Sequence, residues 1–189
     1  ISPILPTAFT QVIKTASSSA TATEQSAIQY SSFQNAVWID QAGSTTGTDY
    51  PSGTRETPVN NISDAKSIAL TRGFSTFQFI GDLVVGSGDI IPSFTLIGQN
   101  AIRSTITIDA AADVTNCEIF EAWISGTLDG NIIIRQSVIG NVDLVAGFIF
   151  ECAFAAGTTT TLSSGAVANF LDCYSGTAGV DTPTIDMSG

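Results

Sequence analysis

Apolar and polar residues follow one another in short runs that recur through the second half of the chain. Each of four runs begins with an apolar residue, continues with a polar or charged one and closes at a glycine, and their starts are 14, 16 and 21 residues apart. Regularly spaced short strands that end at turns are typical of a stacked β-coil. The pattern therefore predicts a β-helix. The four runs are FEAWISG (120–126), IRQSVIG (134–140), FECAFAAG (150–157) and LDCYSG (171–176).

Strands are also expected earlier in the chain, where apolar residues alternate with polar neighbours. Successive side chains of a strand point to opposite faces, so the apolar alternates should face the interior of the coil. The first residues of the four runs would then form one stacked column of the core: Phe120, Ile134, Phe150 and Leu171. The earlier strands are expected over residues 36–40, 74–81, 82–86, 94–98, 104–109 and 117–126.

One helix is expected, over residues 62–73. Asn61 or Ser63 can cap its first turn, and Gly73 supplies its end. The open end of a β-helix is apolar and would template unwanted strand pairing, so we expect this helix to cap that end. Its apolar face at helical spacing consists of Ile62, Ala65, Ile68 and Ala69.

Residues 1–36 differ from the rest of the chain. The segment begins with a proline-containing stretch, ISPILPTAF, and continues with a stretch rich in Ser, Thr and Ala. It contains neither an initiator Met nor a secretory signal, so we expect the chain to be part of a longer polypeptide. We interpret residues 1–36 as an extended or weakly helical arm, which is either a segment that docks on another chain or a flexible linker. Residues 37–189 form the predicted β-helix domain.

Composition and charge exclude several function classes. The 189 residues can bury a sizeable core as one domain. Charged residues make up 12% of the chain, and the net charge is −11. The basic residues are scattered, so we expect neither nucleic-acid binding nor adhesion to anionic membranes. No apolar run approaches the roughly 20 residues of a membrane-spanning helix, so membrane insertion is not expected. The basic residues are Lys14, Arg55, Lys66, Arg72, Arg103 and Arg135.

The three cysteines are Cys117, Cys152 and Cys173. They cannot all pair within one chain, and their spacing matches no zinc pattern. Cys152 and Cys173 occupy the same place in two successive repeats, directly after Glu151 and Asp172. We expect them to be stacked, buried free thiols that act as small hydrophobic residues, rather than a disulfide or a reactive site. Free thiols are consistent with assembly in a reducing cytoplasm.

Carboxylates at matching places in the repeats raise the question of catalysis. Glu121, Glu151 and Asp172 would stand on consecutive rungs with Arg135 between the first two, and adjacent rungs are roughly 4.8 Å apart. A glycosidase needs such a pair of carboxylates. The alternative, which we favour, is an outward, solvated ladder in which Arg135 offsets two carboxylates. Because the chain has no histidine and no cluster of cations, we expect no catalytic residues and no enzymatic activity.

Other candidate sites carry weaker signals. Four aspartates near expected corners could offer oxygen ligands to Ca²⁺, but no EF-hand or nonapeptide repeat is present. The glycine-rich stretches lack phosphate-binding and dinucleotide fingerprints. We therefore expect no metal and no cofactor. The four aspartates are Asp109, Asp113, Asp129 and Asp143, and the tryptophans that could stack on a sugar are Trp38 and Trp123.

The stretch from Val37 to Leu83 carries motifs that resemble a recurring module of bacteriophage virion proteins. In such proteins the module looks like the entry cap and shaft of a right-handed β-helix, which is often trimeric and occurs in tail, collar or head appendages. The resemblance covers about four-fifths of the chain and leaves out the first 36 residues. The motifs are VWID (37–40), GTDYPSGT (47–54), PVNN (58–61), DA (64–65), IA (68–69), RGF (72–74) and FIGDL (79–83), followed by LDGN (128–131), IGN (139–141) and LDCYSG (171–176).

Pattern and resemblance together give an all-β fold, a short right-handed parallel β-helix with an N-terminal capping helix and an extended N-terminal arm. The resemblance implies a structural virion protein, assembled in the host bacterial cytoplasm as a homotrimeric fibre, collar or tail appendage. Its arm would dock on other virion proteins of the neck, tail, baseplate or capsid. An uncharged surface between residues 153 and 170 also favours a trimer. Some of four phenylalanines should face neighbouring chains: Phe148, Phe150, Phe154 and Phe170.

Two alternatives stay open at this point. One is a receptor-binding or polysaccharide-degrading tailspike domain, for which a host surface glycan would be the partner. The other is a capsid decoration protein that contacts a head lattice through residues 1–36.

Overall fold

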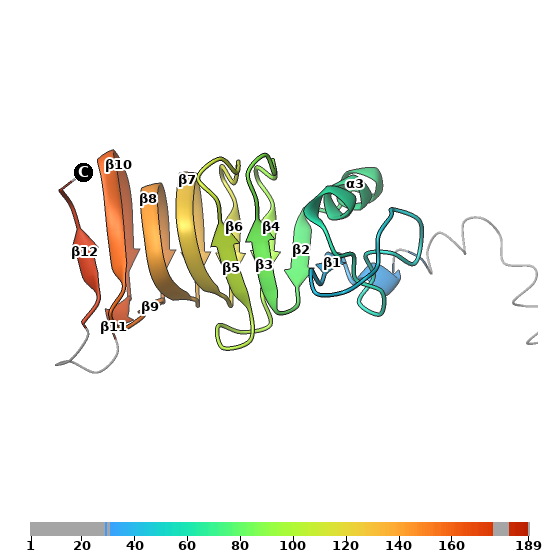
Figure 1. The fold of residues 1–189 in the computed structure, drawn as a ribbon, viewed down its shortest axis with the longest axis horizontal. Helices are drawn as coiled ribbons and strands as arrows, with labels where there is room; N and C mark the ends of the chain where they lie inside the picture. Colours follow the sequence, from blue (N-terminus) through green and yellow to red (C-terminus); the bar gives the residue numbers. More distant parts are fainter. Residues whose placement is uncertain (1–28, 30, 176–181, 189) are drawn as a thin grey trace, which may run out of the picture.

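A computed structural model describes residue 29, residues 31–175 and residues 182–188 of the chain. It is a parallel β-solenoid of about five turns, whose strands stack side by side from β1 to β12 (Figure 1). The predicted all-β solenoid is therefore confirmed, while its right-handedness stays a prediction. The strands are β1 (Val37–Ile39), β2 (Thr76–Phe79), β3 (Asp82–Val85), β4 (Thr95–Ile97), β5 (Thr105–Ile108), β6 (Glu118–Phe120), β7 (Trp123–Arg135), β8 (Val138–Phe150), β9 (Ala153–Phe154), β10 (Thr159–Leu171), β11 (Tyr174–Ser175) and β12 (Thr184–Asp186).

The core consists of inward residues that stack from rung to rung. Each residue of one such column pairs in register with the next, and its members are buried. Parallel pairing in register brings like positions of successive strands together, so apolar side chains stack on apolar side chains. The column consists of Val37, Phe77, Leu96, Ile119, Ile134 and Ile149.

The predicted core column of Phe120, Ile134, Phe150 and Leu171 is wrong by one residue at three of its four positions. Phe120 pairs with Arg135, and Arg135 pairs with Phe150. This neighbouring column faces outward, and Leu171 at its end is 54% exposed. A shift of one residue moves a side chain to the other face of a strand, so register decides which apolar residue enters the core.

The corners that follow β6, β7, β8 and β10 share a local conformation. Glu121, Gln136, Glu151 and Asp172 all have positive φ angles, between 50° and 54°. This left-handed conformation turns the chain sharply, at some cost for a residue other than glycine. The residue after each corner residue is small: Ala122, Ser137, Cys152 and Cys173.

Two of the four predicted runs do not stop at their glycine. Gly126 lies inside β7 and Gly140 inside β8, so each of these strands continues for 13 residues. The register shifts near Gly126, where a Cβ atom would meet the backbone of Ile108. Glycine here permits a close backbone approach inside a strand rather than a turn between strands. Gly157 does lie in a turn, and Gly176 lies outside the described residues.

The expected helix is α3 (Ile62–Arg72), which lies at the β1 end of the stack (Figure 1). The Asn61 side chain accepts a hydrogen bond from the backbone N–H of Asp64 at 2.8 Å, and Gly73 ends the helix with φ 74°. Asn61, rather than Ser63, is thus the N-cap. The predicted apolar face is buried in the same core as β1. That this helix protects the end of the coil stays a prediction.

The end of the predicted arm packs against the domain. Phe33 and Ala36 are buried, and the Phe33 ring lies 5.5 Å from that of Phe74. Residues 1–28 and 30, which make up most of the arm, lie outside the described residues. The division of the chain after residue 36 therefore stays a prediction.

Candidate functional site

The carboxylate ladder differs in order from the one that the repeats predict. Because Phe120 pairs with Arg135, the corner residue between Glu121 and Glu151 is Gln136, not Arg135. The amide Nε2 of Gln136 donates a hydrogen bond to Oε2 of Glu151 at 3.3 Å. Glu121 and Glu151 are thus two rungs apart, about twice the spacing of roughly 4.8 Å between strands. The side chains of Glu121, Gln136 and Glu151 are all exposed, as expected of a solvated ladder.

Arg135 stands on the outward face of the rungs, one residue before the corner. Its guanidinium lies over the Phe150 ring, with the Cζ atom 4.8 Å from the ring centroid. This is a cation–π contact rather than the carboxylate pairing that the sequence predicts. Two phenylalanines flank Arg135 in register, so the cation covers part of an apolar surface.

The cysteines are free, as predicted. Cys117 and Cys152 are buried, but the expected burial of Cys173 is wrong, because this thiol is half-buried. Burial raises the pKa of Cys117 and of Cys152 to about 11 from the ordinary value of 9.0. The Cys152 thiol donates to the carbonyl of Phe150 at 3.0 Å. Thiols held neutral in this way are poor nucleophiles and serve as small core residues.

Two of the four aspartates that were considered as possible Ca²⁺ ligands have local roles. Asp109 accepts a hydrogen bond from the backbone N–H of Ser87 at 3.1 Å, and Asp113 accepts one from that of Thr115 at 3.1 Å. Both carboxylates therefore order turns between rungs. Among the described residues, no three Asp, Glu, Cys or His side chains gather as a metal-binding group. Asp129 and Asp143 are both exposed.

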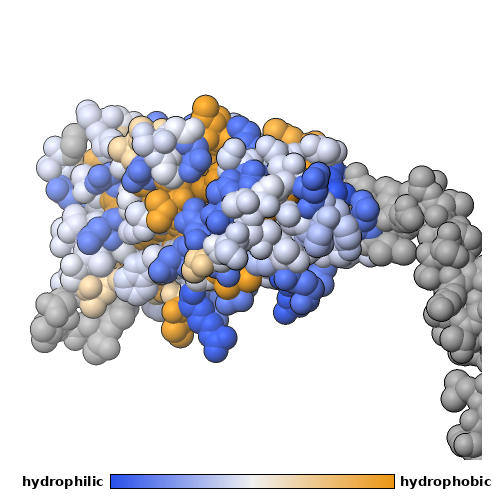
Figure 2. All heavy atoms as spheres, turned by 45° about the vertical axis from the view of Figure 1, so that its right-hand side comes forward, coloured by the Kyte–Doolittle hydropathy of each residue, from blue (hydrophilic) through white to orange (hydrophobic). Residues whose placement is uncertain are grey.

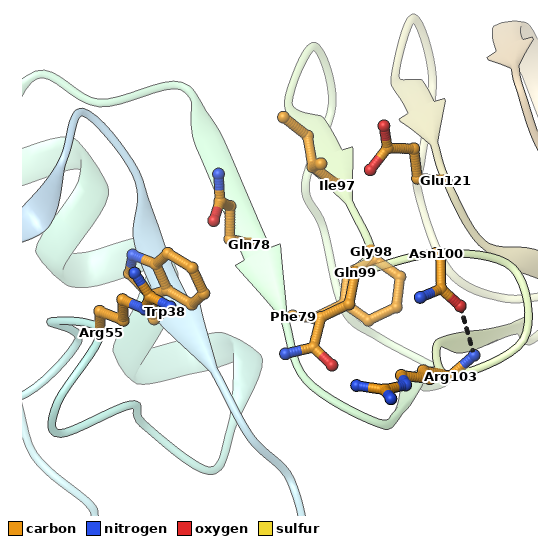
Figure 3. Close-up of a pocket in the computed structure, with 10 residues that line it drawn as sticks. All are labelled: Trp38, Arg55, Gln78, Phe79, Ile97, Gly98, Gln99, Asn100, Arg103 and Glu121. Carbon is orange, nitrogen blue, oxygen red and sulfur yellow. Dashed lines mark hydrogen bonds between the residues drawn. The ribbon is translucent and has the colours of Figure 1, made fainter.

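A pocket of about 430 Å³ lies between the first rungs (Figure 3). It was not predicted, because its residues come from segments that are far apart in the sequence and meet through the register β1–β2–β4–β6. Trp38 and Arg55 stand on one side in Figure 3, and Asn100 and Arg103 stand on the other. The lining residues are Trp38, Arg55, Gln78, Phe79, Ile97, Gly98, Gln99, Asn100, Arg103 and Glu121.

Two contacts orient the polar groups of this pocket. The Arg55 guanidinium lies over the Trp38 ring, with its Cζ atom 5.5 Å from the ring centroid. The Asn100 side-chain oxygen accepts hydrogen bonds from the backbone N–H groups of Ile102 and Arg103, at 2.9 and 3.0 Å. With its oxygen committed to the loop, Asn100 offers its NH₂ group as a donor. Trp38 is itself buried, and its indole N–H has no hydrogen-bond partner among the described residues.

No family model, curated protein or solved structure matches this chain. In the part of the chain that the structure describes, no helix combines the length and the apolar character needed to cross a membrane.

Proposed function

We propose that this chain is a structural virion protein of a bacteriophage, a homotrimeric fibre, collar or tail appendage whose rungs form a rigid shaft. The observation that carries the proposal is the outward apolar surface on a coil whose interior is already filled. A stack of parallel rungs transmits load through a continuous ladder of backbone hydrogen bonds, which suits a mechanical role. The motif resemblance at residues 37–83 supplies the link to phage particles.

The surface that would join the subunits is the outer stripe, defined as Ile133, Phe148, Phe150 and Leu171. Ile133 pairs with Phe148, and Phe150 pairs with Leu171, so the four side chains lie on neighbouring strands. The Phe148 and Phe150 rings are stacked, with their centroids 6.0 Å apart. Phe148 is 38% exposed although it lies on a central strand.

Contiguous apolar residues on a surface mark interaction sites more often than isolated ones do. In Figure 2, apolar groups appear in several separate places on a face that is otherwise mostly pale or blue.

Of the four phenylalanines, some of which were expected to face neighbouring chains, Phe148 and Phe150 belong to the stripe. Phe154 and Phe170 instead pack in or against the core, with their ring centroids 5.7 Å apart.

Sedimentation velocity of the whole chain tests the oligomer. We expect a species of three times the chain mass of 19.6 kDa at micromolar concentration. Phe148→Lys should convert it to a monomer with an unchanged β spectrum in circular dichroism, because a charge would be buried at the interface. Val84→Lys is the matched control, since Val84 is another exposed apolar residue on a strand and lies outside the stripe. A stable wild-type monomer would contradict the trimer.

Residues 1–36 provide the test of location. We expect density for the rungs on the intact particle of a phage that encodes this chain, attached to the neck, tail, baseplate or capsid through the arm. Deletion of residues 1–28 should release the trimer from the particle without dissociating it. Recovery of the deleted form at wild-type occupancy on purified particles would rule out docking through this segment.

A further inference from the structure

The pocket between the first rungs concentrates positive charge in an acidic chain. The net charge is −11 with six basic residues in all, yet Arg55 and Arg103 both line this one pocket. Glu121 is the single carboxylate among its lining residues. The pocket therefore attracts an anion, although the surface of the chain as a whole repels one.

Several side chains that line the pocket keep hydrogen-bonding groups that the fold does not use. Among the described residues, no partner is found for the side-chain amides of Gln78 and Gln99 or for the Arg103 guanidinium. The Asn100 NH₂ group is likewise left as a donor, as its oxygen holds the loop. Groups from separate segments thus converge on one space with their hydrogen-bonding capacity intact, which is typical of a small-molecule site.

The side chains that line the pocket include hydrogen-bond acceptors as well as donors, and this limits the chemical class of the ligand. Two guanidinium groups suit a carboxylate or a phosphate. The Glu121 carboxylate repels a bare anion, but it accepts hydrogen bonds from hydroxyl groups, and the glutamine amides can do both. A ligand that satisfies all of these groups carries one anionic group and several hydroxyls. A sugar acid has this composition, whereas inorganic phosphate and neutral sugars each have only part of it.

We propose that this pocket binds an acidic sugar unit, a uronate-type ring, with its carboxylate at Arg103 and its hydroxyls at Glu121 and the side-chain amides, while Arg55 on the opposite side adds to the positive charge of the pocket. The volume of about 430 Å³ lies within the usual range of small-molecule sites, roughly 300–1,000 Å³. Trp38 holds Arg55 in place through the cation–π contact and is not itself a free stacking surface. One carboxylate does not make the pair that glycoside hydrolysis requires, so the proposed activity is binding. It does not depend on the proposed particle or trimer.

Tryptophan fluorescence of the whole chain provides the readout. The chain has two tryptophans, Trp38 in the pocket and Trp123, so Trp123→Phe leaves one reporter. Glucuronate at constant ionic strength should change the Trp38 emission saturably, because an anion inside the pocket changes the electrostatic environment of the Trp38 ring and of the Arg55 cation over it. Glucose and inorganic phosphate should each bind at least tenfold more weakly. Equal binding of phosphate and glucuronate, or no saturable change with glucuronate, overturns the proposal.

Single substitutions test which residues contact the ligand. Arg103→Gln should weaken glucuronate binding about tenfold or more, since hydrogen bonds to charged groups are the strong ones. Glu121→Gln should reduce the preference for glucuronate over phosphate by removing the repulsion of the bare anion. Arg135→Gln is the matched control, an exposed arginine outside the pocket that should leave affinity unchanged. Arg103 and Glu121 are exposed, so folding should tolerate both changes. Affinity that is insensitive to Arg103→Gln places the anion elsewhere and refutes the assignment.

Discussion

Strands β8 and β10 have the same length and similar patterns, but they differ in burial. Both have 13 residues, and they pair in parallel, with a register shift between Leu162 and Val167. Buried residues are found throughout β8, including Val142, Leu144 and Ile149. In β10, all of whose residues are described, Thr160 is the buried one, while Val167 is 68% exposed.

The difference follows from what stacks on each strand. β8 lies between β7 and β10 along most of its length. β10 has β8 on one side, but on the other, among the described residues, β12 pairs only with Thr159–Thr161. Alternation along a strand decides which side chains point inward, whereas a neighbouring rung decides whether water is excluded from them. The interior of a solenoid rung is therefore completed by its neighbours.

Substitution of two paired leucines by alanine should test the difference in burial between β8 and β10 most clearly. Leu144 in β8 pairs with Leu162 in β10, and Leu144 is buried whereas Leu162 is half-buried. Leu144→Ala should lower the free energy of unfolding by about 2–5 kcal/mol. Leu162→Ala should cost roughly half of that or less, because less apolar surface returns to water. Urea unfolding followed by circular dichroism measures both, and equal losses would contradict the role assigned to the neighbouring rung.

Exchange of small residues at another paired position should give the next largest effect. Gly147 in β8 pairs with Ala168 in β10. A Cβ atom on Gly147 would lie 2.5 Å from the carbonyl oxygen of Ile132, so Gly147→Ala should destabilise the fold by about 1–3 kcal/mol.

The reverse change in β10 serves as the control. Ala168→Gly should cost only about 0.5–1 kcal/mol, which is the entropic cost of glycine in a strand. Thermal unfolding of the two variants side by side checks the difference. A Gly147→Ala variant as stable as the wild type would show that β7 and β8 can separate freely at this point.

Alkaline pH should lower the free energy of unfolding, because two thiols are buried in the core. The unfolded chain ionises a thiol near the ordinary pKa of 9.0, while the folded chain keeps Cys117 and Cys152 neutral up to about 11. The unfolded state thus binds fewer protons in this range, so stability is full below pH 9 and falls as pH rises from 9 to 11. At pH 10 the loss should be about 1 kcal/mol per thiol. Urea unfolding of wild type and Cys152→Ala at pH 8 and 10 measures this loss of stability. If the free energy of unfolding fell equally with pH in both proteins, the buried Cys152 thiol would not be its source.

Cys152 and Cys173 offer a second test of the difference in burial between successive rungs. Cys152 and Cys173 occupy equivalent corners, but Cys152 is buried and Cys173 is half-buried. A thiol reagent at neutral pH should modify Cys173 at least tenfold faster, because Cys152 reacts only when the rungs open locally. Mass spectrometry of the partly labelled chain identifies the site. Cys173→Ser should remove the fast phase and leave the slow one.

The smallest expected effect lies at the other end of the coil, in α3. Asn61→Ala removes the acceptor for the N–H of Asp64 and should cost about 1 kcal/mol. Ser63→Ala should change stability by less than about 0.5 kcal/mol, because Ser63 is an exposed surface position. Differential scanning calorimetry of both variants checks the assignment of the cap, and a larger loss for Ser63→Ala would reverse it.

Features that depend on neighbouring residues in the chain were predictable. The helix, its cap and its buried face follow from hydrogen bonds and periodicity within a dozen residues. The core column was misplaced because Ile119 and Phe120 are both apolar, and periodicity alone does not say which one points inward. The pocket was not predictable, since Trp38 and Glu121 meet only after β1, β2, β4 and β6 have stacked.

The sequence by itself determined that this protein is a solenoid of short parallel strands with a capped helix that begins at Ile62, because alternation, glycine positions and capping residues act over a few residues. Only the tertiary structure decided which residue of each rung enters the core, that Gln136 rather than Arg135 separates Glu121 from Glu151, and that two arginines share a pocket. The physical reason is register. Pairing between strands 15 to 23 residues apart fixes these contacts, and a slip of one residue would exchange the inner face for the outer one.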